Sequence, residues 1–237
     1  MAGTLWSAVA DLVLPVECAG CRASHEPLRR GACARCAAEL SALRPFPARP
    51  DPLPAGLPDC VAVGAYEGPL RQTILSYKER RRSGLAAPLG EMLAEAVARA
   101  AGGAPRAVLL VPVPATAEAA RVRRGDHMRR LAARAARRLR RAGWAAAVAC
   151  PLRALPKPDA AGLDAVRRAA VAQASFRVRP GRVPRTRAKA AGRAVIVVDD
   201  IVTTGSTLAA VTTVLAAQRL VVDGAAVLAA TRRRRPG

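Results

Sequence analysis

The stretch AVIVVDDIVTTGSTL, residues 194–208, decides the fold of this chain. Its β-branched run from Val195 to Val198 predicts a strand that is buried on both faces, as in a parallel sheet. Asp199 and Asp200 follow at the end of that strand, where a parallel sheet presents its ligand crevice. The apolar residues beyond the loop predict a helix from Leu208 to Gln218.

The loop between this strand and this helix consists of small, mostly hydroxyl-bearing residues. Hydroxyls and backbone N–H groups at a helix N-terminus form a ready site for a phosphate. The two neighbouring carboxylates can accept hydrogen bonds from sugar hydroxyls. A helix cap alone needs fewer such residues, so we interpret the segment as a functional site. Its loop residues are Thr203, Thr204, Gly205, Ser206 and Thr207.

Outward from this stretch, short apolar runs alternate with longer helical patterns. Strands that alternate with helices imply parallel pairing and an open α/β sheet with flanking helices. Asp126 is expected to cap a helix that runs to Arg141, because apolar residues recur there at three- and four-residue spacing. The other expected elements are strands at 60–63, 107–111, 145–150 and 225–230 and a helix at 85–101.

Six prolines lie between Ser41 and Pro58. Proline removes a backbone donor and fixes φ, so this segment predicts an extended linker. A chain of 237 residues is long enough for one main domain and a small appendage. We therefore expect an N-terminal module at 1–44, a linker at 45–58 and the α/β domain at 59–237.

Two Cys-x2-Cys pairs, Cys18 with Cys21 and Cys33 with Cys36, lie ahead of the linker. Four thiolates at this spacing are typical of a tetrahedral zinc site. We predict a structural zinc ion with no catalytic role. Disulfides, redox chemistry and an iron–sulfur cluster are the alternatives, and the cytosol disfavours disulfides.

Composition bounds the location and the partners. The 39 Lys+Arg against 17 Asp+Glu give a formal net charge of +22, which is a signature of nucleic-acid binding. Nearly all of the excess is arginine in a background rich in Ala, Gly and Pro, which a GC-rich coding sequence also produces. Aromatic residues make up only 3% and offer few platforms for single-stranded bases. Without an apolar stretch of spanning length or a signal peptide, we expect a cytosolic protein with no membrane insertion.

The whole layout resembles the ComF family, the competence-protein-F-like type I phosphoribosyltransferases. Residues 199–207 are similar to the motif with which such enzymes bind phosphoribosyl pyrophosphate (PRPP). The Cys-rich N-terminus, Tyr66-x-Gly68 and the Pro-Val-Pro sequence at 112–114 also fit the family. The resemblance implies Mg²⁺-dependent transfer of phosphoribosyl from PRPP to an unidentified acceptor, with release of pyrophosphate.

The resemblance also implies roles for single residues. Asp199 and Asp200 would be the catalytic pair that holds the ribose 2- and 3-hydroxyls, and residues 203–207 would cradle the 5-phosphate. Mg²⁺ would sit mainly on PRPP oxygens and waters. The pyrophosphate would be lined by Pro112, Val113 and Pro114, with Arg121, Arg123 or Arg124 as positive partners.

The chain departs from the family where members commonly have Arg-Gly-Phe-Asn-Gln, because residues 124–128 are Arg-Gly-Asp-His-Met. We expect His127 to be a solvated or capping residue rather than a base. A function of another class stays open, a non-catalytic accessory protein of DNA uptake in natural competence that binds single-stranded DNA. The family's link with competence and the basic runs at 77–82 and 232–235 motivate it.

Overall fold

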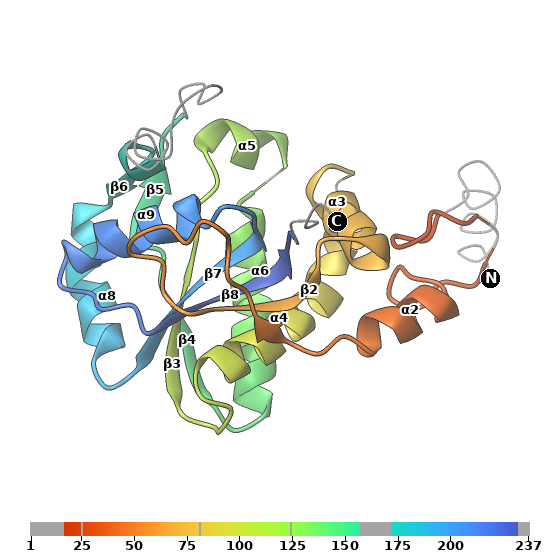
Figure 1. The fold of residues 1–237 in the computed structure, drawn as a ribbon, viewed down its shortest axis with the longest axis horizontal. Coiled ribbons are helices and arrows are strands. Elements are labelled where there is room, and N and C mark those ends of the chain that lie inside the picture. Colours follow the sequence, from red (N-terminus) through yellow and green to blue (C-terminus); the bar gives the residue numbers. More distant parts are fainter. Residues whose placement is uncertain (1–16, 25, 81, 124, 157–171, 232–237) are drawn as a thin grey trace, which may run out of the picture. The chain divides into compact units, whose positions relative to one another are not determined.

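The computed structural model of the chain describes residues 17–24, 26–80, 82–123, 125–156 and 172–231 (Figure 1). The chain divides into two compact units. The smaller is made of Met1–Leu43 and Glu67–Leu85, and the larger of Arg44–Tyr66 and Ala86–Gly237. Within the described ranges, no helix is long and apolar enough to cross a membrane.

A six-stranded sheet with the strand order β1-β2-β8-β7-β3-β4 forms the centre of the larger unit. All neighbouring strands pair in parallel except β1 with β2. The open, mainly parallel α/β sheet expected from the sequence is thus confirmed. Its strands are β1 (Phe46–Pro47), β2 (Cys60–Ala65), β3 (Ala107–Pro112), β4 (Ala145–Val148), β7 (Ala194–Val202) and β8 (Gly224–Ala230).

Helices cover both faces of this sheet (Figure 1). Helices α4 (Ala86–Ala100) and α6 (His127–Arg141) pack on one face, and α8 (Val183–Ala190) and α9 (Ser206–Ala216) on the other. The remaining elements are α5 (Ala117–Val122), a 3-10 helix (Pro180–Arg182) and a two-stranded antiparallel sheet of β5 (Leu152–Ala154) and β6 (Phe176–Val178).

The local sequence explains the two elements that matter most for the site. The first five residues of β7 are buried, as a strand covered on both faces requires. Helix α6 begins directly after Asp126, whose side chain accepts a hydrogen bond from Arg129 N at 3.0 Å. Its apolar positions other than Ala133 are buried while its arginines are exposed, so the predicted amphipathic helix and its cap are confirmed.

Strand β7 continues four residues beyond its expected end at Val198 and reaches Val202. The reason is its partner β8, because Asp199 pairs with Val227 and Ile201 pairs with Ala229. Asp199 and Asp200 therefore lie within the strand near its carboxyl end, and not after it.

The division of the chain into two units differs from the expected module, linker and domain in the place of two segments. The proline-rich segment belongs to the larger unit, because Phe46–Pro47 forms an edge strand on β2 and Ala48 N donates to Cys60 O at 2.7 Å. Residues 67–85 belong to the smaller unit, where Ser76 Oγ donates to Ala19 O at 3.3 Å.

The smaller unit contains α2 (Ala34–Ser41), α3 (Gly68–Lys78) and a 3-10 turn (Ser83–Leu85). Gly20 marks its tightest contact. A Cβ at this position would lie 2.8 Å from Cys36 Sγ and 3.2 Å from Pro69 Cβ. Only glycine lets the first cysteine loop approach both α2 and α3 so closely.

Candidate functional site

The strand order places a topological switch point between β3 and β7. After β3, the next strand of the sheet, β4, is added at its edge. The chain then returns past β3, so that β7 lies on the other side of β3 and β8 lies next to β7. In open α/β sheets, ligands bind outside the carboxyl ends of the strands at such a switch point. Val113 N donates to Val198 O at 2.9 Å, which holds the loop after β3 beside β7. This loop and the carboxyl end of β7 therefore flank the place where a ligand crevice is expected, and we call them its two walls.

Two carboxylates lie at the β7 wall, and each has its own surroundings. Asp199 is half-buried and Asp200 is only 7% exposed. Consecutive strand residues point to opposite faces of a sheet. The Asp200 carboxylate lies 2.9 Å from His127 Nε2. Burial, and secondly the negative charge of Asp199, raises the pKa of the Cys60 thiol to about 12. The two carboxylates are also linked, because Asp200 N donates to Asp199 Oδ1 at 2.9 Å.

The expectation that His127 is a solvated or capping residue is wrong. Its ring is buried, with 8% of the residue exposed, and the cap of α6 is Asp126 instead. The helical period explains this position, because His127 is four residues before Leu131 and eight before Ala135, which are both fully buried. That phase with the buried face is the signal by which the sequence could have identified His127 as an interior residue.

The loop at 203–207 carries the chain from β7 into α9, and Gly205 is its turning point. Gly205 has φ +75°, in the left-handed region that favours glycine. A Cβ there would also lie 3.0 Å from Leu57 Cδ2 and 3.2 Å from Pro50 Cγ. Thr204 Oγ1 lies 2.9 Å from Ser206 Oγ and accepts from Ser206 N at 3.4 Å. Hydroxyls thus gather where the first N–H groups of α9 emerge, which is the chemistry of an anion site.

The other residues predicted for this site have different positions. Pro112 ends β3, Val113 is buried and Pro114 is half-buried, so all three lie along the loop wall. Arg121 is exposed on α5. Arg124 and the segment 157–171 lie outside the described residues.

The four N-terminal cysteines come together in the smaller unit. The sulfurs of Cys18, Cys21, Cys33 and Cys36 all lie within 4.8 Å of one another, and the Cys21 and Cys33 sulfurs are 3.8 Å apart. Four thiolates about 2.3 Å from a tetrahedral zinc ion would be about 3.8 Å apart. All four are free thiols. The cluster could therefore bind a metal ion such as zinc.

Backbone N–H groups stabilise one of these thiols as a thiolate. Gly20 N and Cys33 N donate to Cys18 Sγ at 3.4 and 3.2 Å. Burial is the largest influence on the Cys18 thiol and raises its pKa, but the backbone N–H donors together with the Cys21 side chain outweigh it and lower the pKa to about 6. Burial and the neighbouring cysteines raise the pKa of the Cys36 thiol. A metal ligand must be deprotonated, so this N–H donation suits metal binding at Cys18.

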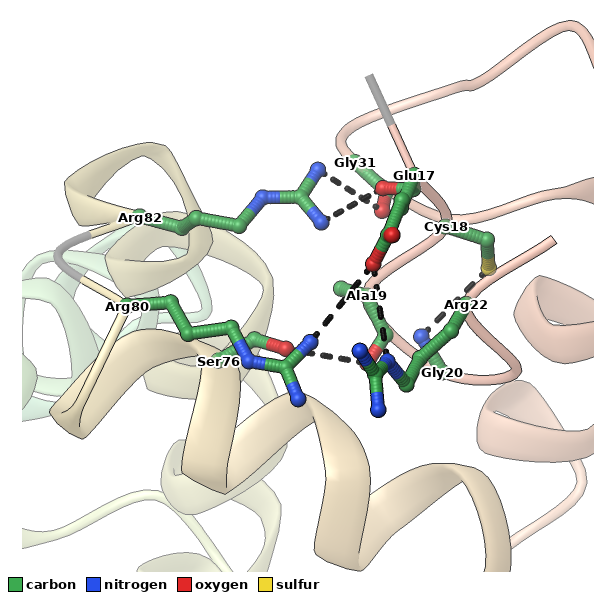
Figure 2. Close-up of polar contacts among 9 residues, drawn as sticks. All are labelled: Glu17, Cys18, Ala19, Gly20, Arg22, Gly31, Ser76, Arg80 and Arg82. Atoms are coloured by element: carbon green, nitrogen blue, oxygen red, sulfur yellow. Dashed lines mark hydrogen bonds and ion pairs between the residues drawn. The ribbon is translucent and has the colours of Figure 1, made fainter. Parts of the chain in front are cut away.

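Side chains in and directly after α3 bind the loops that carry the cysteines (Figure 2). Arg82 donates to Glu17 O at 2.6 Å and to Gly31 O at 3.4 Å. The guanidinium of Arg80 lies 3.7 Å from the Glu17 carboxylate. Together with the hydrogen bond from Ser76 to Ala19 O, these contacts connect α3 and the residues after it to both loops that carry the cysteines.

Comparison with known protein families identifies the carboxylate site's context. Residues 130–236 match the phosphoribosyl transferase domain. The matched residues run from within α6 through β8 and include Asp199, Asp200 and the loop at 203–207. No curated protein matches the chain. The mainly parallel sheet and its switch point agree with this match, so residues 130–236 are similar to a phosphoribosyl transferase domain.

Proposed function

We propose that the protein is a PRPP-binding phosphoribosyltransferase of the ComF family. It would transfer phosphoribosyl from PRPP to an unidentified acceptor and release pyrophosphate. The observation that carries the proposal is the meeting of two carboxylates and a loop of hydroxyl-bearing residues at the switch point. Asp199, Asp200 and residues 203–207 all lie within the segment that matches the phosphoribosyl transferase domain.

The parts of PRPP would be shared between the two walls of the crevice. The exposed hydroxyls and N–H groups of the 203–207 loop would hold the 5-phosphate, because a helix N-terminus favours an anion. Asp199 and Asp200 would accept from the ribose hydroxyls. Residues 112–114 would line the pyrophosphate on the other wall, with Arg121 and Arg124 as positive partners. This distribution places the anomeric carbon between the walls.

Bond breaking at the anomeric carbon produces positive charge on the ribose and negative charge on the departing pyrophosphate. The protein's contribution is then chiefly positioning and electrostatic stabilisation. Carboxylates at the strand end are hard oxygen donors that suit Mg²⁺, which binds proteins through one or two carboxylates together with substrate phosphates and water. When bound, the ion would neutralise the pyrophosphate.

The cysteine cluster has a structural role in this proposal. A closed four-thiolate zinc site leaves no open position for chemistry, and its binding energy contributes to folding. Reduced thiols are maintained in the cytosol, which is where we place the protein.

Titration calorimetry with PRPP and Mg²⁺ tests the proposal, followed by pyrophosphate release with purine, pyrimidine and amine acceptors. Thr204→Val removes a hydroxyl from the loop and should weaken binding several-fold, on the scale of one hydrogen bond. Thr213→Val is the matched control, because its hydroxyl donates to Ala209 O further along α9. Absence of PRPP binding to wild type would overturn the proposal, and binding without turnover would restrict it to a PRPP-binding module.

A second function is favoured by one specific observation on α6. Its solvent face carries seven exposed arginines over four turns, Arg129, Arg130, Arg134, Arg137, Arg138, Arg140 and Arg141. Such a face attracts polyanions through counterion release. It supports the alternative of a DNA-uptake accessory that binds single-stranded DNA, in which PRPP binding would be regulatory or absent.

A further inference from the structure

Two consecutive residues at the start of α6 reach both walls of the crevice. Asp126 Oδ2 accepts from Ala115 N at 3.4 Å, in the loop that follows β3. His127 Nε2 lies 2.9 Å from Asp200 Oδ2 on β7. Asp126 Oδ1 meanwhile caps the helix by accepting from Arg129 N. One point of the chain, anchored by a 15-residue helix, thus contacts both walls.

The His127–Asp200 contact is buried, which makes it a strong constraint. The side chains are only 11% and 10% exposed. A buried carboxylate needs hydrogen-bond partners, and such a bond is stronger where water is excluded. An imidazole with its proton on Nε2 donates to the Asp200 carboxylate and holds it in one rotamer. The Asp199 carboxylate is held separately, because it accepts from the backbone Asp200 N, which is part of the strand itself.

We propose that Asp126 and His127 are positioning residues, which fix the separation of the two walls and the orientation of the Asp200 carboxylate before PRPP binds. This inference rests on the proposed function, because it assigns the ribose to Asp199 and Asp200. Transfer that depends on positioning is sensitive to small displacements of the holding groups. We call the two contacts, Asp126 with Ala115 N and His127 with Asp200, the clamp. Because the clamp is formed in the free protein, it also lowers the entropy cost of ordering the site when PRPP binds.

His127→Leu and His127→Gln form the first test. Leucine keeps the volume without a donor, whereas the glutamine amide nitrogen reaches the position of the imidazole Nε2. We expect His127→Leu to lose about tenfold or more in affinity for PRPP with Mg²⁺, on the scale of one hydrogen bond to a charged group. His127→Gln should regain most of that loss. Equal, wild-type affinity in both variants would overturn the clamp.

Asp126→Asn tests the contact of Asp126 with the loop after β3. Its remaining carbonyl oxygen can still cap α6, but its amide nitrogen cannot accept from Ala115 N. We expect weaker PRPP binding with helix content unchanged. Asp223→Asn is the structural control, because Asp223 accepts from Val195 N at 2.8 Å. Val195 lies at the amino end of β7, the strand that also carries Asp200. Asp223→Asn should lower the melting temperature and leave PRPP affinity intact. If Asp223→Asn weakens binding as much as Asp126→Asn does, the effect is general destabilisation and the clamp falls.

A ligand-free measurement separates this inference from the proposed function. The ¹⁵N shifts of the His127 ring should change in Asp200→Asn, and His25→Ala assigns the signals because the chain has two histidines. If the shifts respond but wild type does not bind PRPP, the proposed function fails while the His127–Asp200 pair stands. If PRPP binds but the shifts do not respond, the clamp fails and the function stands.

Discussion

Asp199 and Asp200 are consecutive in β7, yet they serve opposite faces of the sheet. Asp200 bonds to His127 at the start of α6, on one face. Asp199 acts electrostatically on Cys60, which lies in the core that α9 covers on the other face. Consecutive carboxylates in a strand therefore are not equivalent, and one of them is fixed by the interior while the other is half-exposed at the crevice.

This difference predicts distinct outcomes for two conservative variants. Asp199→Asn should weaken PRPP binding by about ten- to a hundredfold, because a carboxamide replaces a charged acceptor worth about 1.5–3 kcal/mol. Its melting temperature should change little. Asp200→Asn should weaken binding and also lower the melting temperature, because its buried partner His127 loses a charged acceptor. Calorimetry and thermal unfolding measure both effects.

The double variant Asp199→Asn with Asp200→Asn provides the decisive comparison. Under the proposed roles it retains neither charged acceptor for the ribose, and PRPP binding should be nearly abolished. Wild-type affinity in this double variant would mean that the motif is misassigned. Loss of affinity together with loss of the folded state would have to be separated by circular dichroism at the temperature of the titration.

The conformation of the phosphate loop is tested by Gly205→Ala. Alanine at φ +75° costs about 1–2 kcal/mol, and its Cβ would also crowd Leu57 and Pro50. Gly143→Ala is a matched control, because Gly143 has φ +82° but no heavy atom within 4 Å of the place that a Cβ would take. We expect Gly205→Ala to lose more stability than Gly143→Ala in urea unfolding, and to lose PRPP affinity as well. Equal losses would show that the crowding has no effect.

Much of the fold follows from local sequence. The β-branched run identifies β7, because strands buried on both faces carry such runs. Asp126, with the apolar period behind it, gives the start and the inner face of α6. The cysteine spacing predicts the cluster, since its ligands lie close in sequence within two short pairs. In each case, the deciding interactions are within a few residues of one another.

The relationships that sequence reasoning missed are those between distant segments. His127 and Asp200 are 73 positions apart, and only the strand order brings the start of α6 to the end of β7. Ser76 and Ala19 are 57 positions apart. The extension of β7 to Val202 likewise depends on its partner β8 and not on its own residues. No local propensity or motif spacing contains this information.

The buried Cys60 thiol predicts a loss of stability at alkaline pH. Its pKa is about 12 in the folded protein, raised first by burial and then by Asp199, against roughly 8.5 in an unfolded chain. At a pH below the pKa of the unfolded chain, the thiol is protonated in both the folded and the unfolded state. The stability that the buried, protonated thiol contributes is then fully present. As pH rises above about 8.5, only the unfolded state releases the proton, and stability falls by at most about 1.4 kcal/mol for each pH unit until the folded value is reached.

Urea unfolding of Cys60→Ala between pH 8 and 10.5 checks this. The variant should be less stable at pH 8 because of the smaller side chain, but its stability should decline less steeply with pH than that of wild type. Asp199→Asn should keep nearly the wild-type slope, since burial, the larger cause of the raised pKa of Cys60, remains. Parallel slopes for all three proteins would contradict the assignment of the pH dependence to Cys60.

Metal binding at the cysteine cluster should hold the α3 segment in place. Purified protein should contain about one zinc ion for each chain, and Cys33→Ser should lose it. Because Arg82 and Ser76 bind the backbone of the cysteine loops, loss of the metal should release residues 76–82 to trypsin, which cleaves after Arg80 and Arg82. Mass spectrometry of timed digests with and without a chelator reads this out.

Cys150→Ser is the control for the metal experiment. Cys150 lies in the larger unit, outside the cluster of four thiols, so this variant should keep both the zinc and the resistance to trypsin. Metal analysis that finds no zinc after purification under reducing conditions without chelators would refute the site. Iron with visible charge-transfer absorption would indicate a cluster in its place.

The arginine face of α6 separates the two proposed functions. If it binds single-stranded DNA, affinity should fall steeply with salt, because each neutralised phosphate releases about 0.7 counterion. Changing Arg137, Arg138 and Arg141 to glutamine should then reduce the slope of log affinity against log salt by about 2. An equal charge loss elsewhere, at exposed Arg35, Arg99 and Arg185, should leave most of the slope. Equal reductions in both triple variants would mean that net charge alone attracts DNA. If wild type shows no binding near physiological salt, the arginines are compositional and the DNA-binding alternative is excluded.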